Sequence, residues 1–223
     1  TMDSVKSAIS VANAMAAGKI IKKYLPPSPL RRYESLDRLI GAKVYVKHEN
    51  HNPTGTFKIR GGINLMHHLA ARGVTGAITY STGNHGTSVG TSAQMFDLSA
   101  VVVVPEKSNP IKVQSIKDTG ATLVEHGRDF EAAGQKVAQM VKEKGLYFVH
   151  PANEPLLVNG VATEFLEIIE ALPDLDTIII PIGAGSEAAA AVTVFKAIRP
   201  DVEVIAVQAE AASAAWLSWK EKR

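Results

Sequence analysis

Short β-branched runs alternate with helix-like segments along almost the whole chain of 223 residues. The uninterrupted apolar runs VVVV and TIII are typical of strands that are covered on both faces, as in parallel sheets. Alternation with short links therefore predicts an open α/β architecture with mainly parallel sheets, as one domain or as two lobes with a cleft between them. The expected strands are KVYVKHE (43–49), GAITYS (76–81), SAVVVVP (99–105), ATLVEH (121–126), LYFVH (146–150), DTIIIP (176–181) and VEVIAVQ (202–208).

Each expected strand is followed by a helical pattern. Asn109 and Pro110 are typical of a helix start, Asp129 of an N-cap, and Gly145 of a helix end. A helix is also expected to reach about residue 97, another to cover roughly 155–171, and alanine-rich helices to follow the last two strands.

Composition narrows the class of function. The net charge is +2 without a long basic run, which argues against nucleic acid and anionic membrane as partners. No cysteine is present, so disulfides, thiolate metal sites and a cysteine nucleophile are excluded. With no membrane span and no signal peptide in the pattern, we expect a cytoplasmic enzyme that acts on a small molecule and holds no metal.

Lys58 is the first unusual residue, in the stretch PTGTFKIRGG (53–62). Turn residues precede it and an amphipathic run follows, so it is expected at a helix start, where the helix dipole disfavours a cation. Partial burial and the dipole both favour the neutral, nucleophilic amine. The alternative is a lysine whose amine reaches water and does no chemistry.

Two expected strands end in unusual loops, and ligands of open α/β sheets bind at such ends. STGNHG (81–86) combines hydroxyls with glycines, so Ser81, Thr82 and the backbone N–H groups there are expected to hold a carboxylate or a phosphate. The alternative is a simple helix-capping turn.

GAGSEA (183–188) lets the backbone approach an anion closely at a helix start. It also fits the dinucleotide pattern G-x-G-x-x-G/A, although the next strand ends in Gln208 and not in an acid. Two further patterns carry less weight: Ser88 in GTSVG is expected inside a helix and not on a nucleophile elbow, and His48 and His51 lack metal-site spacing.

An activated lysine, a carboxylate cradle and a phosphate cradle suit one cofactor, pyridoxal 5′-phosphate, which carries an aldehyde and a phosphate. The chain resembles the fold-type II (tryptophan synthase β-like) pyridoxal-phosphate enzymes, in the group of threonine/serine dehydratases (ammonia-lyases) and serine racemases. The stretches that carry the resemblance are SPL (28–30), KHEN and NPTGTFKIRGG within residues 47–62, STGNHG (81–86), VHPANEP (149–155) and PIGAGS (181–186).

The resemblance implies roles for individual residues. Lys58 is the Schiff-base lysine and proton shuttle, and Asn84 binds the cofactor's ring hydroxyl and lies near the substrate. Ser81, Thr82 and His85 surround the substrate carboxylate. The residues implied to hold the cofactor phosphate are Gly183, Ala184, Gly185 and Ser186.

The resemblance also implies an organisation: a large cofactor-binding domain from residues 1–66 and 154–223, a small inserted domain from residues 67–153, and a homodimer. The chain is expected to lack a C-terminal segment of the large domain. In the phosphate loop Ala184 and Ser186 replace glycines, which leaves the backbone donors in place. Thr82 stands where racemases carry a serine, and Gln208 where they tend to carry a cation-binding carboxylate.

The expected reaction is therefore conversion of L-threonine to 2-oxobutanoate and ammonia, or of L-serine to pyruvate. A serine racemase, a threonine synthase-like β-replacement enzyme and a lyase for a bulkier hydroxy amino acid are alternatives within the same chemistry. An NAD-dependent oxidoreductase that uses GAGSEA, or a non-catalytic binding protein, would belong to another class.

Overall fold

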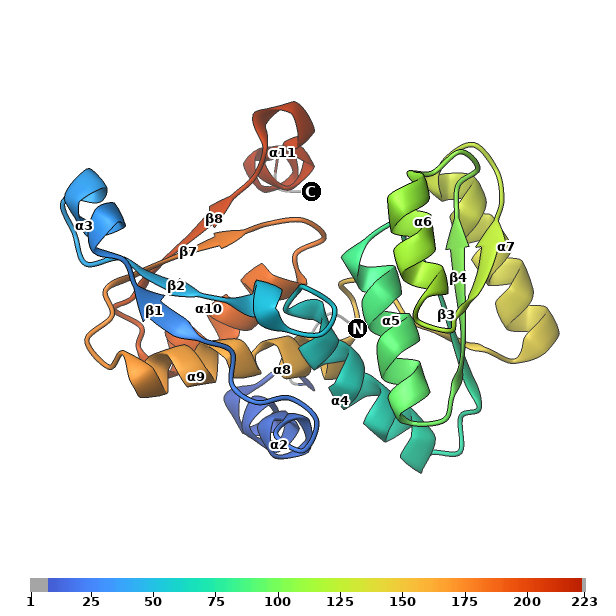
Figure 1. Cartoon of the computed structure of the whole chain (residues 1–223), viewed down its shortest axis with the longest axis horizontal. Helices are drawn as coiled ribbons and strands as arrows, with labels where there is room; N and C mark the ends of the chain where they lie inside the picture. The colour runs from blue at the N-terminus through green and yellow to red at the C-terminus, as the bar shows by residue number, and fades with distance from the viewer. Residues whose placement is uncertain (1–7, 222–223) are drawn as a thin grey trace.

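The computed structural model describes residues 8–221, and Figure 1 shows how their elements are arranged. Helices and strands alternate along most of the chain, as the sequence predicts. In chain order the elements are α2 (Val11–Ile21), β1 (Leu30–Arg32), α3 (Glu34–Ile40), β2 (Tyr45–Lys47), η1 (Glu49–His51), α4 (Lys58–Ala71), β3 (Gly76–Tyr80), α5 (Asn84–Met95), β4 (Ser99–Val104), α6 (Pro110–Lys117), β5 (Thr122–Glu125), α7 (Phe130–Lys144), β6 (Tyr147–Phe148), α8 (Pro155–Val161), α9 (Thr163–Ala171), β7 (Thr177–Pro181), α10 (Ser186–Ile198), β8 (Glu203–Val207), η2 (Glu210–Ala212) and α11 (Ala214–Glu221).

The largest sheet has four parallel strands in the order β5-β4-β3-β6. Successive side chains of a strand point to opposite faces. Val102 and Val104 of β4 accordingly belong to the core that contains α5, whereas Val101 and Val103 belong to the core that contains α7. Helices α5 and α6 lie on one side of this sheet and α7 on the other (Figure 1). The VVVV run is thus covered on both faces, which confirms the prediction.

Strands β7 and β8 form a separate parallel pair, in which Ile178 lies beside Val204. Ile178 and Ile180 are buried in the core that includes α10, but Ile179 between them is 68% exposed. The prediction that TIII is covered on both faces is therefore wrong for the described part of the chain. Within residues 8–221, the hydrophobic core reaches only one face of this pair.

The first expected strand is shorter than predicted and does not join a parallel sheet. Only Tyr45–Lys47 of the run 43–49 is extended, and it pairs antiparallel with Leu30–Arg32, a strand that the sequence did not indicate. A strand of three residues, such as β1, is too short for alternation to reveal it.

Several helix ends follow the predicted residues. The Asn109 side chain accepts hydrogen bonds from two N–H groups of α6, and Asp129 caps α7, which Gly145 ends in a left-handed conformation. The helix expected over 155–171 is two helices, α8 and α9, which meet at Ala162. Helix α5 ends at Met95, two residues before the expected position.

Helices α4 and α8 pack closely because two glycines allow it. A Cβ on Gly160 would lie 2.6 Å from the Arg60 carbonyl oxygen, and a Cβ on Gly61 would lie 2.7 Å from the Leu157 carbonyl oxygen. Close contact of these helix backbones fixes the start of α4, and therefore the position of Lys58.

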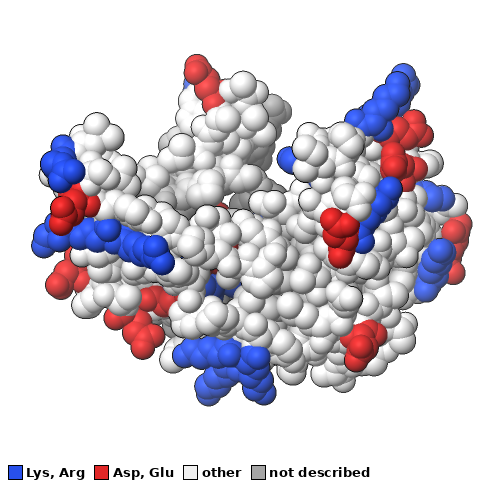
Figure 2. Space-filling model, viewed as in Figure 1, with Lys and Arg blue, Asp and Glu red and all other residues white. Residues whose placement is uncertain are grey.

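The surface carries no single field of charge on the face drawn in Figure 2. Positive and negative side chains alternate there in small groups, and the surface is hollowed between α11 and α6. Of the helices in residues 8–221, none is both long and apolar enough to cross a membrane.

Candidate active site

A cavity of about 500 Å³ lies where three helix starts converge, those of α4, α5 and α10. Both loops that the sequence singled out reach it, together with Lys58. All predicted site residues line this cavity except Thr82, which is half-buried beside it. The lining residues are Phe57, Lys58, Tyr80, Ser81, Gly83, Asn84, His85, Lys112, Phe130, Pro151, Pro181, Gly183, Ala184, Gly185, Ser186 and Glu187.

Lys58 is the first residue of α4 and is half-buried. Burial lowers the pKa of Lys58, while the charges of Glu187 and Glu164 act in the opposite direction. The Ser88 hydroxyl donates to the Lys58 carbonyl oxygen at 2.7 Å, which ties α5 to the start of α4. The pKa is lowered, as predicted for an amine placed here.

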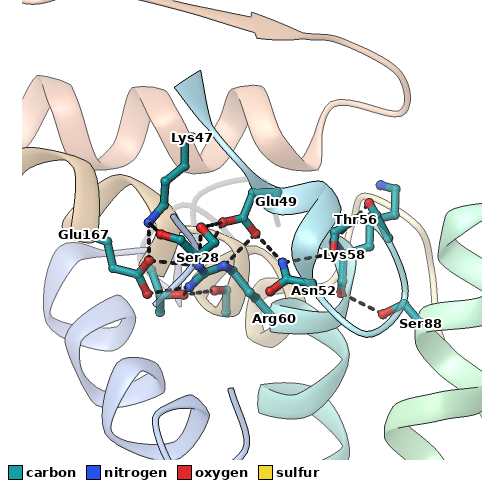
Figure 3. A network of polar contacts seen from close by, with 11 residues as sticks. Ser28, Lys47, Glu49, Asn52, Thr56, Lys58, Arg60, Ser88 and Glu167 are labelled. Atoms are coloured by element: carbon teal, nitrogen blue, oxygen red, sulfur yellow. Dashed lines mark hydrogen bonds and ion pairs between the residues drawn. The ribbon is translucent and has the colours of Figure 1, made fainter. Parts of the chain in front are cut away.

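A buried ion network lies beside Lys58 (Figure 3). Arg60 is 1% exposed and donates to Glu49 at 2.8 Å and to Glu167 at 2.7 Å. Glu167 also accepts from Lys47 at 2.5 Å, so the charges of two cations and two carboxylates cancel within the network. Asn52 joins Glu49 to the Thr56 carbonyl, which holds the loop that leads into Lys58. Sequence reasoning missed this network, because partners up to 120 residues apart leave no local pattern.

The first wall of the cavity is the loop after β3, STGNHG. Asn84 begins α5, and the Ser81 hydroxyl accepts from the Gly83 N–H at 3.2 Å. His85 is 4% exposed, and its Nε2 lies 3.3 Å from the Val149 carbonyl oxygen. Burial lowers the pKa of His85 to about 4, so its ring is neutral near pH 7.

The second wall is the loop after β7, GAGSEA. Gly185 has φ +98°, which turns the chain into α10. Within the described chain, no hydrogen bond engages the backbone N–H groups of residues 183–186. A Cβ on Gly183 or Gly185 would meet no atom within 4 Å, so packing does not require these glycines, and open space lies beside them. Free N–H groups at a helix start suit an anion such as a phosphate.

Glu187 was not singled out from the sequence, although it lines the cavity. Burial raises the pKa of Glu187 to about 7, with the Lys58 charge acting in the opposite direction. The available signal was an acid placed directly after an anion-binding loop.

The weaker motifs have structural explanations. Ser88 is buried inside α5 and is not a nucleophile elbow. The Gln208 side chain accepts from the N–H groups of Ala215 and Trp216, so it orients α11. The His48 ring meets the Tyr33 hydroxyl at 2.7 Å. The structure, over residues 8–221, contains no group of three His, Asp or Glu side chains arranged to hold a metal ion.

Comparison with known proteins places these features in a family. Residues 21–223 match the model of the family described as pyridoxal-phosphate dependent enzyme. The chain is 33% identical to an L-threonine ammonia-lyase of Thermotoga maritima over 91% of its length and 51% of the relative's.

Two solved structures share the fold. The maize serine racemase superposes with a TM-score of 0.92 at 28% identity, over 97% of this chain and 66% of that one. Threonine deaminase isoform 2 of Solanum lycopersicum gives 0.88 at 28% identity, over 100% and 61%. The chain thus spans about half of the length of its L-threonine ammonia-lyase relatives and about two thirds of these structures.

The family match covers most of the chain, and the fold matches the same class of enzyme. In this chain, the loops STGNHG and GAGSEA meet at one cavity with Lys58, whose pKa is lowered. The chain belongs to the family of pyridoxal-phosphate dependent enzymes.

Proposed function

We propose that the protein is an ammonia-lyase that converts L-threonine to 2-oxobutanoate and ammonia, and L-serine to pyruvate and ammonia. The observation that carries the proposal is the position of Lys58. It is an amine with a lowered pKa, in a cavity bounded by two loops of anion-binding type. The L-threonine ammonia-lyase relatives support the choice of substrate.

The second wall fits the cofactor's phosphate. The backbone N–H groups of Gly183, Ala184, Gly185 and Ser186 would hold it, and their side chains are too small to block it. Asn84, on the opposite wall, would hydrogen-bond the ring hydroxyl. When bound, pyridoxal phosphate supplies an aldehyde that takes up an amine and a ring that withdraws electrons.

Ser81, Thr82 and His85 would orient the substrate carboxylate, with hydroxyl groups and backbone N–H groups as donors. Since His85 is neutral near pH 7, it contributes a hydrogen bond and not a charge. The Lys58 Nζ atom takes the proton from the substrate Cα, for which it must be a neutral amine. Burial favours that state.

Elimination needs one base, whereas racemisation needs a second proton donor on the opposite face. Thr82 stands at that second position by resemblance, and a β-branched side chain is restricted at χ1. Thr82 also lies outside the cavity lining. D-Serine should therefore form at least ~100-fold more slowly than pyruvate. A serine racemase is the second candidate, because the maize enzyme shares the fold; D-serine that forms as fast as pyruvate would favour it.

The position of the four-stranded sheet supports a division of the chain into two domains. Residues 67–153 contain the whole four-stranded sheet, so we assign them to a small domain inserted in a larger one formed by 1–66 and 154–223. We also expect a cytoplasmic homodimer.

The test uses the purified protein that contains this chain. Borohydride reduction followed by peptide mapping should find the pyridoxyl group on Lys58. Lys58→Ala should lose the group and lower 2-oxobutanoate formation by at least ~10³-fold, without unfolding. Lys43→Ala, at an exposed lysine, is the matched control and should keep both. A pyridoxyl group on another lysine, or tight NAD binding without pyridoxal phosphate binding, would overturn the proposal.

A further inference from the structure

Glu187 occupies a position that is unexpected for an acid. It is the second residue of α10, directly after the four residues assigned to the phosphate, and it lines the cavity. A carboxylate at a helix start is favourable in itself, through the helix dipole. That explanation predicts a lowered pKa, whereas burial raises the pKa of Glu187 to about 7. A phosphate bound at the same helix start would disfavour the ionised carboxylate further.

Lys58, in contrast, must lose a proton before it can react. A lysine reacts as a nucleophile only after its ammonium has lost a proton. Lys58 lies at the start of α4, as Glu187 lies at the start of α10, and both face the same cavity. They share no hydrogen bond or ion pair within the described chain, yet each shifts the pKa of the other.

We infer that Glu187 accepts the proton of Lys58 when the phosphate-bearing cofactor enters the cavity. An N–H bond of the Lys58 ammonium breaks and an O–H bond forms on the Glu187 carboxylate, so that a cation and an anion become a neutral amine and a neutral acid. The same transfer makes Lys58 nucleophilic and removes the negative charge beside the phosphate. The proton crosses through a bridging water or after rotation of the Glu187 side chain. This inference rests on the proposed function.

The other carboxyl groups near Lys58 are poorer acceptors. Glu164 of α9 is 2% exposed, and neither of its carboxyl oxygens has a hydrogen-bond partner in the described chain. Burial raises the pKa of Glu164 well above its usual range, which disfavours the ionised form that a proton acceptor needs. Glu49 of η1 is engaged by Arg60, which outweighs the effect of burial and lowers the pKa of Glu49.

The remaining titratable groups that face the cavity come from β3, α5 and α6. His85 has a pKa of about 4 and therefore accepts a proton weakly. Tyr80 presents a phenol, a weaker acceptor than a carboxylate, and Lys112 is a cation. Glu187 is the acceptor that remains among the groups of the described chain.

The test measures the rate at which pyridoxal phosphate attaches to Lys58 at pH 6 to 9, by borohydride trapping and peptide mapping. Glu187 must be ionised to accept a proton. With a pKa of about 7, the ionised fraction of Glu187, and with it the attachment rate, should rise about ten-fold from pH 6 to pH 8 and then level off. In Glu187→Gln the rate at pH 8 should be at least about ten-fold lower and should keep rising to pH 9.

Comparison between variants isolates the protein, because free pyridoxal phosphate ionises identically in every assay. Glu187→Asp should restore the levelling profile. Glu203→Gln, an exposed acid on β8, should leave the profile unchanged. Calorimetry with pyridoxine phosphate, which has no aldehyde, should show that Glu187→Gln still binds the phosphate.

Each other outcome has a separate meaning. Equal rates and the same profile in the original protein and Glu187→Gln would overturn the role of Glu187 and leave the proposed function standing. Loss of pyridoxine phosphate binding in Glu187→Gln would also overturn it, by assigning Glu187 to the cradle itself. Absence of attachment to Lys58 in the original protein would overturn the proposed function and this inference with it.

Discussion

The two parallel sheets bear the two walls of the cavity, but they are built differently. The four-stranded sheet carries STGNHG at the end of its inner strand β3 and is covered on both faces, with Val102, Val103 and Val104 each 0% exposed. The β7–β8 pair places GAGSEA and leaves Ile179 68% and Val207 52% exposed. The run VVVV therefore lies in a sheet that is covered on both faces, whereas the run TIII lies in a strand pair that is covered on one face. An apolar run predicts a strand, but it does not predict what covers it.

The same charge placed in both sheets should have very different costs. Val103→Asp should lower the free energy of unfolding by about 5 kcal/mol, because it buries an unpaired carboxylate. Ile179→Asp should cost less than about 1 kcal/mol, because the side chain faces solvent in the described chain. Denaturant unfolding of both variants measures the difference. If Ile179→Asp proved as costly as Val103→Asp, this face of β7 would be covered in solution.

The ion network beside Lys58 offers a second contrast, between a buried and an exposed arginine. Arg60→Met should cost about 4 kcal/mol, because it leaves Glu49 and Glu167 buried without their shared partner. Arg32→Met removes an exposed pair with Asp37 and should cost less than about 1 kcal/mol. Thermal unfolding of both variants tests this contrast. Equal losses would show that the Arg60 network contributes no more than a surface ion pair.

Local features of the fold could be predicted from the sequence. Residues that act within one turn were predictable: Asn109, Asp129 and Gly145 cap helices through neighbours a few residues away. The helix start at Lys58 and both loops were predictable for the same reason, and the resemblance added the cofactor. The roles given to the site residues stay predictions.

Features that depend on distant parts of the chain were not predictable. Arg60 meets Glu167 across 107 residues, and Glu187 becomes unusual only because the fold buries it in the cavity that Lys58 also lines. The exposure of Ile179 likewise depends on which elements reach β7, and no local pattern of apolar residues records that.

The first wall should also make the stability of the protein depend on acid, through His85. The pKa of His85 is about 4 in the folded protein, mainly because of burial, and about 6.5 when unfolded. The unfolded chain therefore binds the proton first as the pH falls, and stability is lost between about pH 6.5 and pH 4, by at most about 3 kcal/mol. His85→Gln should flatten this part of the profile, whereas His126→Gln, at an exposed histidine, should not. Unfolding measured from pH 7 to pH 4 gives the answer, and an unchanged profile in His85→Gln would contradict it.

The smallest expected effect concerns the turn in the second wall, GAGSEA. Gly185 lies in the left-handed region, so Gly185→Ala should cost about 1 kcal/mol of stability through backbone strain. Gly183→Ala, in the same loop but outside that region, meets no atom within 4 Å and should be nearly neutral for stability. Both substitutions add one methyl group beside the cavity, so their difference in thermal unfolding isolates the strain. Calorimetry with pyridoxine phosphate should then show weaker binding for Gly185→Ala, because a relaxed turn moves the N–H groups of α10 away from the anion. If both variants lost the same stability and the same affinity, the added methyl group and not the turn would be the cause. The geometry of the second wall would then not depend on Gly185.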